Sequence, residues 1–434
     1  MRHWRPLLLI YSLLCILTIA CTRGAKSDFV LVKEGKFYIG ERPYRYVGTN
    51  FWYGALLGSQ GEGGDRARLA RELDHMKACG INNLRILVGA DGANGDRFKV
   101  EPTLQTKPGE YNAEVLDGLD YLLSEMGKRG MYAILYLNNS WEWSGGYSQY
   151  LTWSGHGEAP LPAVDGWETF RDYVSQFADS KEAQALFMDH VRYILGRTNA
   201  YTRKKYIEDP TIMSWQIGNE PRAFSDAAKP GFEAWMKEAA ALIRELDPNH
   251  LISTGSEGKY GCEVDMSLFE RLHADPNVDY LTIHIWPYNW NWVDKGNIPS
   301  GMDSALMLTH LYIDEHVEVA QRLNKPLVIE EFGFPRDSVR YTPGSPTTLK
   351  DRYYTDLFGY VLESIQKGAP LAGANFWAWG GEGCTSEDHD YWQRGDDYTG
   401  DPAQEPQGLY SVFAVDSSTM EIITRYARSF SELK

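Results

Sequence analysis

Cysteine is scarce in this 434-residue sequence, which contains five cysteines and no Cys-x-x-Cys spacing. A small scaffold held together by a disulfide framework is therefore excluded. A chain of this length buries enough apolar surface to fold without such bonds. We expect the three cysteines beyond the N-terminal region, Cys79, Cys262 and Cys384, to be mostly buried thiols.

Basic residues are also in short supply, with 43 lysines and arginines against 59 aspartates and glutamates and a formal net charge of −16. No run of lysine and arginine stands out. Proteins that bind nucleic acid need basic patches that neutralise phosphates and release counterions. We therefore exclude nucleic acid as a partner and expect a neutral substrate.

An apolar run from Leu7 to Ala20 is shorter than the ~20 residues that a membrane-spanning helix requires. It follows Arg2 and Arg5, and a basic start before a short apolar core is typical of a signal peptide. Cys21 comes directly after Ala20, and this pair resembles the cleavage site of bacterial lipoproteins, whose cysteine carries the lipid.

This N-terminal resemblance predicts a signal peptide at 1–20, a lipidated Cys21 with a short polar tether over 21–27, and one folded domain at 28–434. The protein would then be exported and anchored to a membrane, in the periplasm or on the cell surface. Thr18 stands where such signals usually have leucine. Ordinary signal-peptide cleavage, which would give a secreted protein, therefore stays open.

The domain after residue 28 contains neither a repeat nor a Pro/Ser-rich linker, so a single unit is the simplest interpretation. Short β-branched or aromatic runs alternate with stretches of helical period. Eight runs are expected to be strands: 44–49, 83–88, 132–137, 212–218, 251–254, 280–285, 327–331 and 373–377. The alternation predicts an α/β fold, a single (β/α)8 TIM barrel. An open doubly wound sheet is the alternative, although no Gly-x-Gly-x-x-Gly motif follows the first strand.

Two helix starts can be predicted from capping residues. Asp65 precedes an amphipathic stretch with apolar side chains at Leu69, Leu73 and Met76. Asp179 and Glu182 have the spacing of a capping box and predict the start of another helix.

Polar and aromatic residues gather where the predicted strands end, while the preceding residues are largely apolar. Catalytic groups of a parallel barrel lie at these carboxyl ends. The positions hold Arg85, Asn138, Trp141, Asn219, Glu220, Arg222, His284, Trp286, Glu331 and Trp377. Aromatic residues are frequent in the whole chain, at 13%. Tryptophan and tyrosine suit partners with apolar faces and polar edges, as sugar rings have.

Glu220 lies just after the fourth predicted strand and Glu331 ends the seventh, and these two strands lie on opposite sides of a closed barrel. Glycoside hydrolysis needs one protonated carboxyl to release the leaving alcohol and one carboxylate to attack or to activate water. Helix caps or structural ion pairs are the alternative role for these two residues. Side chains alternate along a strand, so the adjacent Glu330 is expected to face the helix layer or neighbouring loops.

Two motifs resemble those of glycoside hydrolase family 5. Asn219-Glu220-Pro221 is similar to its acid/base motif, and Glu331-Phe332-Gly333 is similar to its nucleophile motif. Longer matches, which cover essentially the whole chain after residue 28, resemble the β-mannanase branch: Leu137–Trp141 with the following Gly145-Gly146, Gln149-Tyr150 and Trp153, then Asp209–Ile212, and Glu405–Tyr410.

The family resemblance implies that Glu220 is the general acid/base and Glu331 the nucleophile of a retaining mechanism. It implies that Arg85 supports the nucleophile, Asn219 contacts the sugar beside the scissile bond, and His284 orients the acid/base region. Trp377 would stack under the sugar. Further candidates for substrate contact are Asn138, Trp141 and Arg222. The family commonly has tyrosine where this chain has Trp286, whose indole N–H donates a hydrogen bond but accepts none.

The activity implied is cleavage of internal β-1,4-mannosidic bonds of mannan, glucomannan or galactomannan by a monomer without cofactor or metal. The partners would be the β-mannan polysaccharide or oligosaccharide and, through the lipid alone, a membrane. An exo-β-mannosidase or a β-1,4-glucanase on the same barrel is an alternative, because a fold does not fix the substrate. A non-catalytic glycan-binding lipoprotein is a second, which the presence of both carboxylates disfavours. A purely structural envelope protein would give no reason for paired acids.

An acidic loop follows the last predicted strand. Its carboxylates are Glu387, Asp388, Asp390, Asp396, Asp397 and Asp401. Several oxygen ligands can hold calcium. These residues lack the regular spacing of a known calcium loop, so a solvated loop is favoured.

Overall fold

The computed structural model describes residues 28–95 and 98–433. Eight parallel strands form one sheet in the order β10-β9-β8-β5-β4-β13-β12-β11. Their bounds are β4 Tyr46–Asn50, β5 Asn83–Leu87, β8 Tyr132–Tyr136, β9 Ile212–Gln216, β10 Leu251–Ser253, β11 Leu281–Ile285, β12 Leu327–Phe332 and β13 Leu371–Phe376. Each of the eight predicted strands is confirmed to within two residues at either end.

The first and last strands of this order, β10 and β11, also come together. The backbone N–H of Asp279 donates to the carbonyl of Ile252 (2.8 Å), and that of His284 donates to the carbonyl of Glu257 (3.2 Å). These bonds link the two ends of the sheet, so the predicted (β/α)8 barrel is confirmed and the open doubly wound sheet is wrong.

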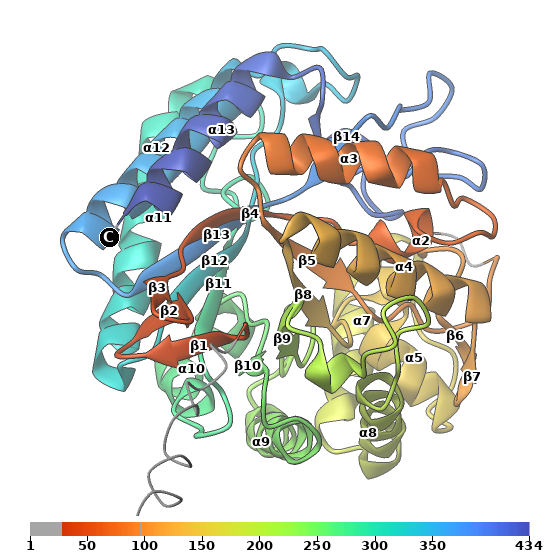
Figure 1. Cartoon of the computed structure of the whole chain (residues 1–434). Coiled ribbons are helices and arrows are strands. Elements are labelled where there is room, and N and C mark those ends of the chain that lie inside the picture. The colour runs from red at the N-terminus through yellow and green to blue at the C-terminus, as the bar shows by residue number, and fades with distance from the viewer. Residues whose placement is uncertain (1–27, 96–97, 434) are drawn as a thin grey trace, which may run out of the picture.

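Helices surround the barrel on all sides (Figure 1). The main ones are α3 Arg66–Ala78, α4 Ala113–Arg129, α8 Lys181–Leu195, α9 Lys229–Leu246, α10 Met266–His273, α11 Ile298–Leu323, α12 Thr348–Gln366 and α13 Ser417–Glu432. Asp65 caps α3 as predicted, because its side chain accepts a hydrogen bond from the N–H of Arg68. The cap of α8 is Ser180 and not Asp179, which has αR backbone angles at the end of the preceding 3-10 turn.

A small antiparallel sheet closes the amino end of the barrel. It consists of β1 Val30–Lys33, β2 Lys36–Ile39 and β3 Arg42–Pro43. Phe37 is buried and packs edge-on against Tyr280 at the start of β11, with 5.3 Å between ring centroids. The apolar face of this sheet therefore seals the end of the barrel that lies opposite the carboxyl ends of the strands.

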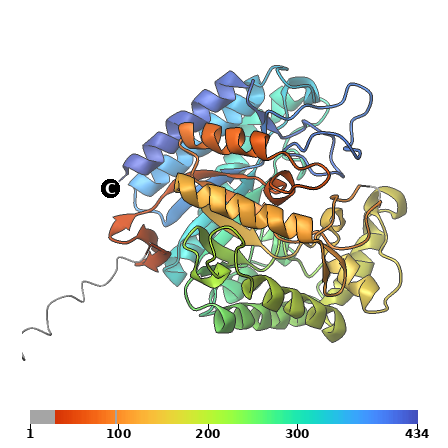
Figure 2. The same cartoon turned by 45° about the vertical axis from the view of Figure 1, so that its right-hand side comes forward.

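The longest additions lie at the carboxyl ends of the strands. Between β8 and β9 the chain forms η1 Glu142–Ser144, α5 Gly146–Trp153, α6 Pro162–Asp165, α7 Trp167–Val174 and η2 Ser175–Ala178 before α8 begins. Figure 2 shows this segment, in yellow, projecting from one side of the barrel. We call residues 141–178 the β8–β9 insertion. The loop between β14 Trp379–Gly381 and β15 Val412–Phe413 covers another side of the same end.

Two expectations about single residues are corrected. Among the described cysteines, Cys262 is buried, Cys79 is half-buried and Cys384 is exposed, so the thiols are not mostly buried. Asp401 of the acidic loop is not solvated, because its carboxylate is buried and accepts hydrogen bonds from the N–H groups of Gly408 and Tyr410. The aspartate shapes the turn that leads back to the barrel.

The predicted signal peptide, Cys21 and the tether lie outside the described residues. None of the helices in the described ranges has the length and apolar character needed to cross a membrane.

Candidate active site

A cavity of about 410 Å³ opens at the carboxyl ends of the strands. Its size falls within the range of about 300–1,000 Å³ that is common for small-molecule sites. Acidic and aromatic side chains dominate its wall, which is formed by Trp141, Glu142, Trp143, Trp167, Arg171, Asn219, Glu220, Arg222, Glu257, Trp286, Asn289, Trp290, Glu331, Trp377, Pro402, Gln404 and Glu405.

Glu220 lies just beyond the end of β9 in a backbone conformation that is uncommon for a residue other than glycine, with φ of 48°. Several hydrogen bonds hold this conformation. The Ser140 hydroxyl donates to the Glu220 carbonyl, and the Glu220 N–H donates to the carbonyl of Gly255 (2.9 Å). Such strained positions concentrate at functional sites. Here the strain turns the carboxyl of Glu220 into the cavity.

Two side chains hold the carboxylate of Glu220. Nδ1 of His284 lies 2.8 Å from one oxygen, and the indole N–H of Trp141 donates to the other. Burial by itself raises the pKa of this carboxyl, but the hydrogen bond and charge of His284 outweigh it, so the pKa of Glu220 is lowered. Burial opposes the charge on His284 as well, yet the two nearby glutamates, Glu331 first, raise its pKa to about 9.

Glu331, at the end of β12, faces Glu220 across the cavity. Arg85 donates to one of its oxygens, and Nδ1 of His284 lies 3.3 Å from the other. One oxygen of Glu220, one of Glu331 and a ring nitrogen of His284 all lie within 4.8 Å of one another. Retaining glycosidases place their carboxyl groups about 5–5.5 Å apart, and inverting ones about 6.5–9.5 Å apart. The observed spacing is that of a retaining site.

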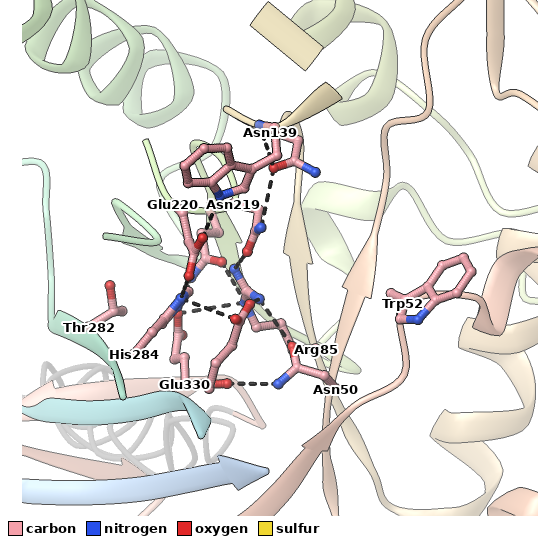
Figure 3. A network of polar contacts seen from close by, with 12 residues as sticks. Asn50, Trp52, Arg85, Asn139, Asn219, Glu220, Thr282, His284 and Glu330 are labelled. Carbon is pink, nitrogen blue, oxygen red and sulfur yellow. Dashed lines mark hydrogen bonds and ion pairs between the residues drawn. The ribbon is translucent and has the colours of Figure 1, made fainter. Parts of the chain in front are cut away.

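Arg85 is fully buried in the barrel and has a partner for each of its nitrogens (Figure 3). Besides Glu331, the guanidinium donates to Asn50 (3.0 Å), Asn219 (2.8 Å) and Gln216 (2.7 Å). The fixed fork of a guanidinium holds its partners in one geometry. Arg85 therefore links Asn219, the residue before Glu220, to the carboxylate of Glu331.

Glu330 lies in the barrel interior and not against the helix layer or the loops, so that prediction is wrong. It accepts hydrogen bonds from Gln216 and Tyr280 and lies 3.7 Å from Nε of Arg85. The reason is a β-bulge, in which Ile283 pairs with Ile329 and His284 already pairs with Glu331. The extra residue breaks the alternation of side chains. Burial raises the pKa of the Glu330 carboxyl.

Three tryptophans line one side of the cavity. Trp377 lies 6.4 Å from Trp143 and 6.1 Å from Trp286, measured between ring centroids. Trp286 in turn packs against Tyr410 at 4.9 Å. A Cβ atom added at Gly333 would meet Trp286 at 2.9 Å, so only glycine after Phe332 leaves room for this indole. Trp286 thus acts as a wall of the cavity, beside Trp377.

Arg222 and Trp141 form the opposite side. Arg222 lies 3.2 Å from Glu257 and has its guanidinium 5.8 Å from the ring of Trp141. Asn138, also predicted to contact substrate, lies outside the cavity wall. It is buried, and its side chain accepts a hydrogen bond from the N–H of Asn139 (2.6 Å). Its carbonyl accepts from the N–H of Asn219 (2.8 Å), so it supports the backbone before Glu220.

Comparison with known proteins now identifies the family. Residues 27–434 match the family described as GH family 5 beta-mannosidase-like. The chain belongs to glycoside hydrolase family 5. The enzyme is 29% identical to mannan endo-1,4-beta-mannosidase 7 of Arabidopsis thaliana over 81% of this chain and 78% of that protein. It is 31% identical to mannan endo-1,4-beta-mannosidase 4 of Solanum lycopersicum over 66% of this chain and 69% of that protein.

Solved structures of family 5 enzymes share its fold. A family 5 mannosidase from Rhizomucor miehei is 35% identical, with a TM-score of 0.85 over 94% of this chain and 98% of that one. An endo-beta-1,4-mannanase from Thermotoga petrophila is 24% identical, with a TM-score of 0.66 over 90% of this chain and 78% of that one. The second likeness shows the barrel alone.

Three carboxyls in the cavity wall of this family 5 enzyme are not among the predicted site residues. Burial raises the pKa of Glu142 and of Glu257 to about 7, and that of Glu405 well above the usual range. All three line the cavity. Glu142 lies next to Trp141, a predicted substrate contact, and Glu405 is the first residue of the motif Glu405–Tyr410. Both could therefore have been found from the sequence. Glu257 follows β10 in a stretch with no motif.

The family 5 site has a group of atoms close enough to share a metal ion, formed by Glu220, His284 and Glu331. A bound cation would compete with Arg85, which already brings a positive charge to Glu331. The chemistry of two opposed carboxylates needs no metal. Among the described residues, the acids of the loop at 387–401 form no group of three or more such ligands.

Proposed function

We propose that this family 5 enzyme hydrolyses internal β-1,4-mannosidic bonds of mannans, as a monomer and with retention of configuration. The observation that carries the proposal is the pair of carboxylates. Oxygens of Glu220 and Glu331 lie within 4.8 Å of each other in the cavity. Trp377 and Trp143 line the same cavity. The family match and the two plant relatives named as mannan endo-1,4-beta-mannosidases support mannan as substrate.

The first step forms a covalent intermediate. The carboxylate of Glu331 attacks the anomeric carbon, while Glu220 gives a proton to the departing glycosidic oxygen. Arg85 donates a hydrogen bond to Glu331 and holds this carboxylate in position for the attack. Trp377 provides an apolar face on which the sugar ring stacks.

The proton for this step is held between Glu220 and His284. Because the pKa of His284 is raised to about 9 and that of Glu220 is lowered, the empty site keeps the proton on the imidazole. The 2.8 Å hydrogen bond between Nδ1 of His284 and the carboxylate gives the proton a direct path to Glu220, which passes it on to the glycosidic oxygen. In the second step Glu220 acts as a base and removes a proton from water, which attacks the anomeric carbon and releases Glu331.

Release of single mannose units from chain ends is the second candidate function. The 35% identity and TM-score of 0.85 to a solved family 5 mannosidase favour it. A variant of that mannosidase was solved in complex with mannosyl-fructose, a short ligand. In this chain, the buried Glu142 and the half-buried Glu405 both line the cavity, where their carboxyls could hold the end of a short substrate.

The test is a time course of products from mannohexaose, glucomannan and cellulose. Internal cleavage gives mannobiose and mannotriose before mannose accumulates, whereas release from an end gives mannose from the first minute. Equal turnover of cellulose and mannan would contradict the choice of mannan and favour a β-1,4-glucanase. Absence of any reducing sugar from all three would leave only a glycan-binding protein.

We also propose that the enzyme is an exported lipoprotein, anchored through Cys21 in the periplasm or at the cell surface. The basic start, the apolar run to Ala20 and the cysteine that follows support this. Cys21→Ala should move the enzyme from the membrane fraction to the soluble fraction of the producing cell. A wild-type protein that is already soluble and carries no acyl chain would contradict the anchor and leave ordinary secretion.

A further inference from the structure

An exposed tryptophan marks the outer rim of the cavity. Trp167 is the first residue of α7 in the β8–β9 insertion, and its side chain is 53% exposed although it lines the cavity. Arg171, one helical turn later, lines the same rim. Among residues 28–95 and 98–433, Arg171 has no ion-pair partner. A tryptophan and an arginine at the mouth of a cavity suit a ligand that has apolar faces and hydroxyl groups.

A chain of contacts places this rim relative to the reacting bond. One oxygen of Glu220 faces His284 and the nucleophile, and the other accepts from the indole of Trp141. Trp167 meets Trp141 edge-on, with 5.8 Å between the ring centroids and 90° between their planes. The order outward from the nucleophile is therefore Glu331, Glu220, Trp141 and Trp167.

The general acid must reach the oxygen of the leaving group, so the leaving sugar departs on the side of Glu220 away from the nucleophile. That side is the one occupied by Trp141 and Trp167. Trp377 and Trp143 lie on the opposite wall, where they contact the sugar that Glu331 attacks.

We propose that Trp167 and Arg171 form a binding site for the leaving or incoming saccharide, a β-linked hexopyranoside. The proposal rests on the proposed retaining mechanism. Trp167 stacks on the apolar face of the sugar, and the guanidinium of Arg171 donates hydrogen bonds to its hydroxyls. Both residues come from the β8–β9 insertion, so this segment sets what the enzyme accepts beyond the scissile bond.

The same site would decide the fate of the covalent intermediate. The ester bond between the anomeric carbon and Glu331 breaks when an incoming oxygen forms a new bond to that carbon. Glu220 takes the proton of the incoming hydroxyl. With water the product is a free reducing sugar, which is mannose when the donor carries a single mannosyl unit, and with a saccharide hydroxyl it is a longer oligosaccharide. By microscopic reversibility an incoming saccharide occupies the place of a leaving one, so Trp167 and Arg171 raise the share of transfer over hydrolysis.

The experiment uses β-mannosyl fluoride as the donor and mannobiose as the acceptor. Fluoride is a small leaving group that reaches neither Trp167 nor Arg171, and its release counts every intermediate formed. The ratio of trisaccharide to free mannose reports how well the acceptor binds. We expect Trp167→Ala to lower this ratio about tenfold, since an aromatic stacking contact of about 1–1.5 kcal/mol corresponds to that factor. Arg171→Ala should lower it severalfold, and Trp167→Phe should give an intermediate ratio.

Val164→Ala is the matched control, because Val164 lies on α6 of the same insertion, is 70% exposed and lies outside the cavity wall. It should leave the ratio within twofold of the wild type. An unchanged ratio in both Trp167→Ala and Arg171→Ala overturns the proposal, as does a wild-type enzyme that releases fluoride but forms no trisaccharide.

A wild-type enzyme that releases no fluoride instead contradicts the proposed function. A misfolded variant loses fluoride release, whereas loss of the acceptor site alters the ratio.

Discussion

Glu330 and Glu331 are neighbours in the sequence, yet both turn toward the guanidinium of Arg85. Glu331 contacts Nη1 at the cavity, and Glu330 lies 3.7 Å from Nε in the barrel interior. A bulge between β11 and β12 makes this possible, because it inserts one residue into β12 at that point. One arginine thus lies beside two glutamate side chains, of which Glu331 alone lines the cavity.

The nucleophile can be identified by chemical rescue. Glu331→Ala should lower turnover about 10⁴- to 10⁶-fold, as removal of a nucleophile does in other covalent mechanisms. Added azide should then restore cleavage of an activated aryl mannoside and give a product of inverted configuration, measured by NMR. An inverted azide product from Glu330→Ala would instead assign the nucleophile to Glu330.

The acid/base residue has a different signature. Glu220→Ala should lower turnover of mannohexaose about 10²- to 10⁴-fold, because the leaving oxygen receives no proton. Formation of the intermediate from a mannoside with a good leaving group should be much less affected, and azide should yield a product of retained configuration. Equal losses on both kinds of substrate would contradict the acid role.

Glu330 should matter for stability more than for chemistry. Glu330→Gln keeps the shape but removes a charge beside Arg85 and leaves one amide N–H group facing the N–H donors of Gln216. We expect the free energy of unfolding to fall by about 1–3 kcal/mol, measured in denaturant, with the azide products of the other variants unchanged. Glu363→Gln, an exposed glutamate on α12, is the control for loss of a charge. A Glu330→Gln protein as stable as the wild type would exclude a structural role for the buried carboxyl.

His284 should set the alkaline limit of activity. The raised pKa of about 9 means that the cluster keeps its proton below that pH and loses it above, so kcat/KM should fall through about pH 9. In His284→Gln the proton resides on Glu220 alone. Loss of the histidine removes the main cause that lowers the pKa of this carboxyl, and burial then raises it, but from an ordinary value of about 4.3 that lies far below the pKa of the imidazole. The alkaline limb should then move to lower pH, measured with a mannoside that has a poor leaving group. His310→Gln, which removes a histidine paired with Asp356 outside the cavity, should not move the limb. An unmoved limb in His284→Gln would contradict the shared proton.

Substitution of Trp377 should lower turnover of the substrate without a matching loss of stability. Trp377→Ala removes the aromatic face and should lower kcat on mannohexaose at least tenfold. Trp377→Phe keeps a ring and should recover part of that loss. Thermal unfolding of both variants separates the effect from instability, because a merely structural residue would lower the melting temperature in proportion to the loss of activity.

The barrel and the catalytic pair could be predicted because both depend on local patterns. Eight apolar runs at regular spacing specify the strands, and the polar residues that end them must meet at one edge of a parallel barrel. Glu220 and Glu331 stand at predicted strand ends, and together with Asn219, Pro221 and Phe332-Gly333 they form the two motifs that resemble those of family 5. The same reasoning predicts four further residues at the strand ends, and each lies close to Glu220 or Glu331 in the structure: Arg85, Asn219, His284 and Trp377.

The rest required the tertiary structure, because it depends on contacts between segments far apart in the chain. The direction of Glu330 follows from a bulge that forms only when β11 and β12 pair. Asn138 supports the backbone because its carbonyl meets the N–H of Asn219 on the neighbouring segment. Glu257 and Glu405 become cavity walls only once their loops pack over the barrel. The order of the strands, by contrast, follows from the alternation of strands and helices along the chain. The direction of a side chain at a strand end depends on the neighbours that the fold brings next to it.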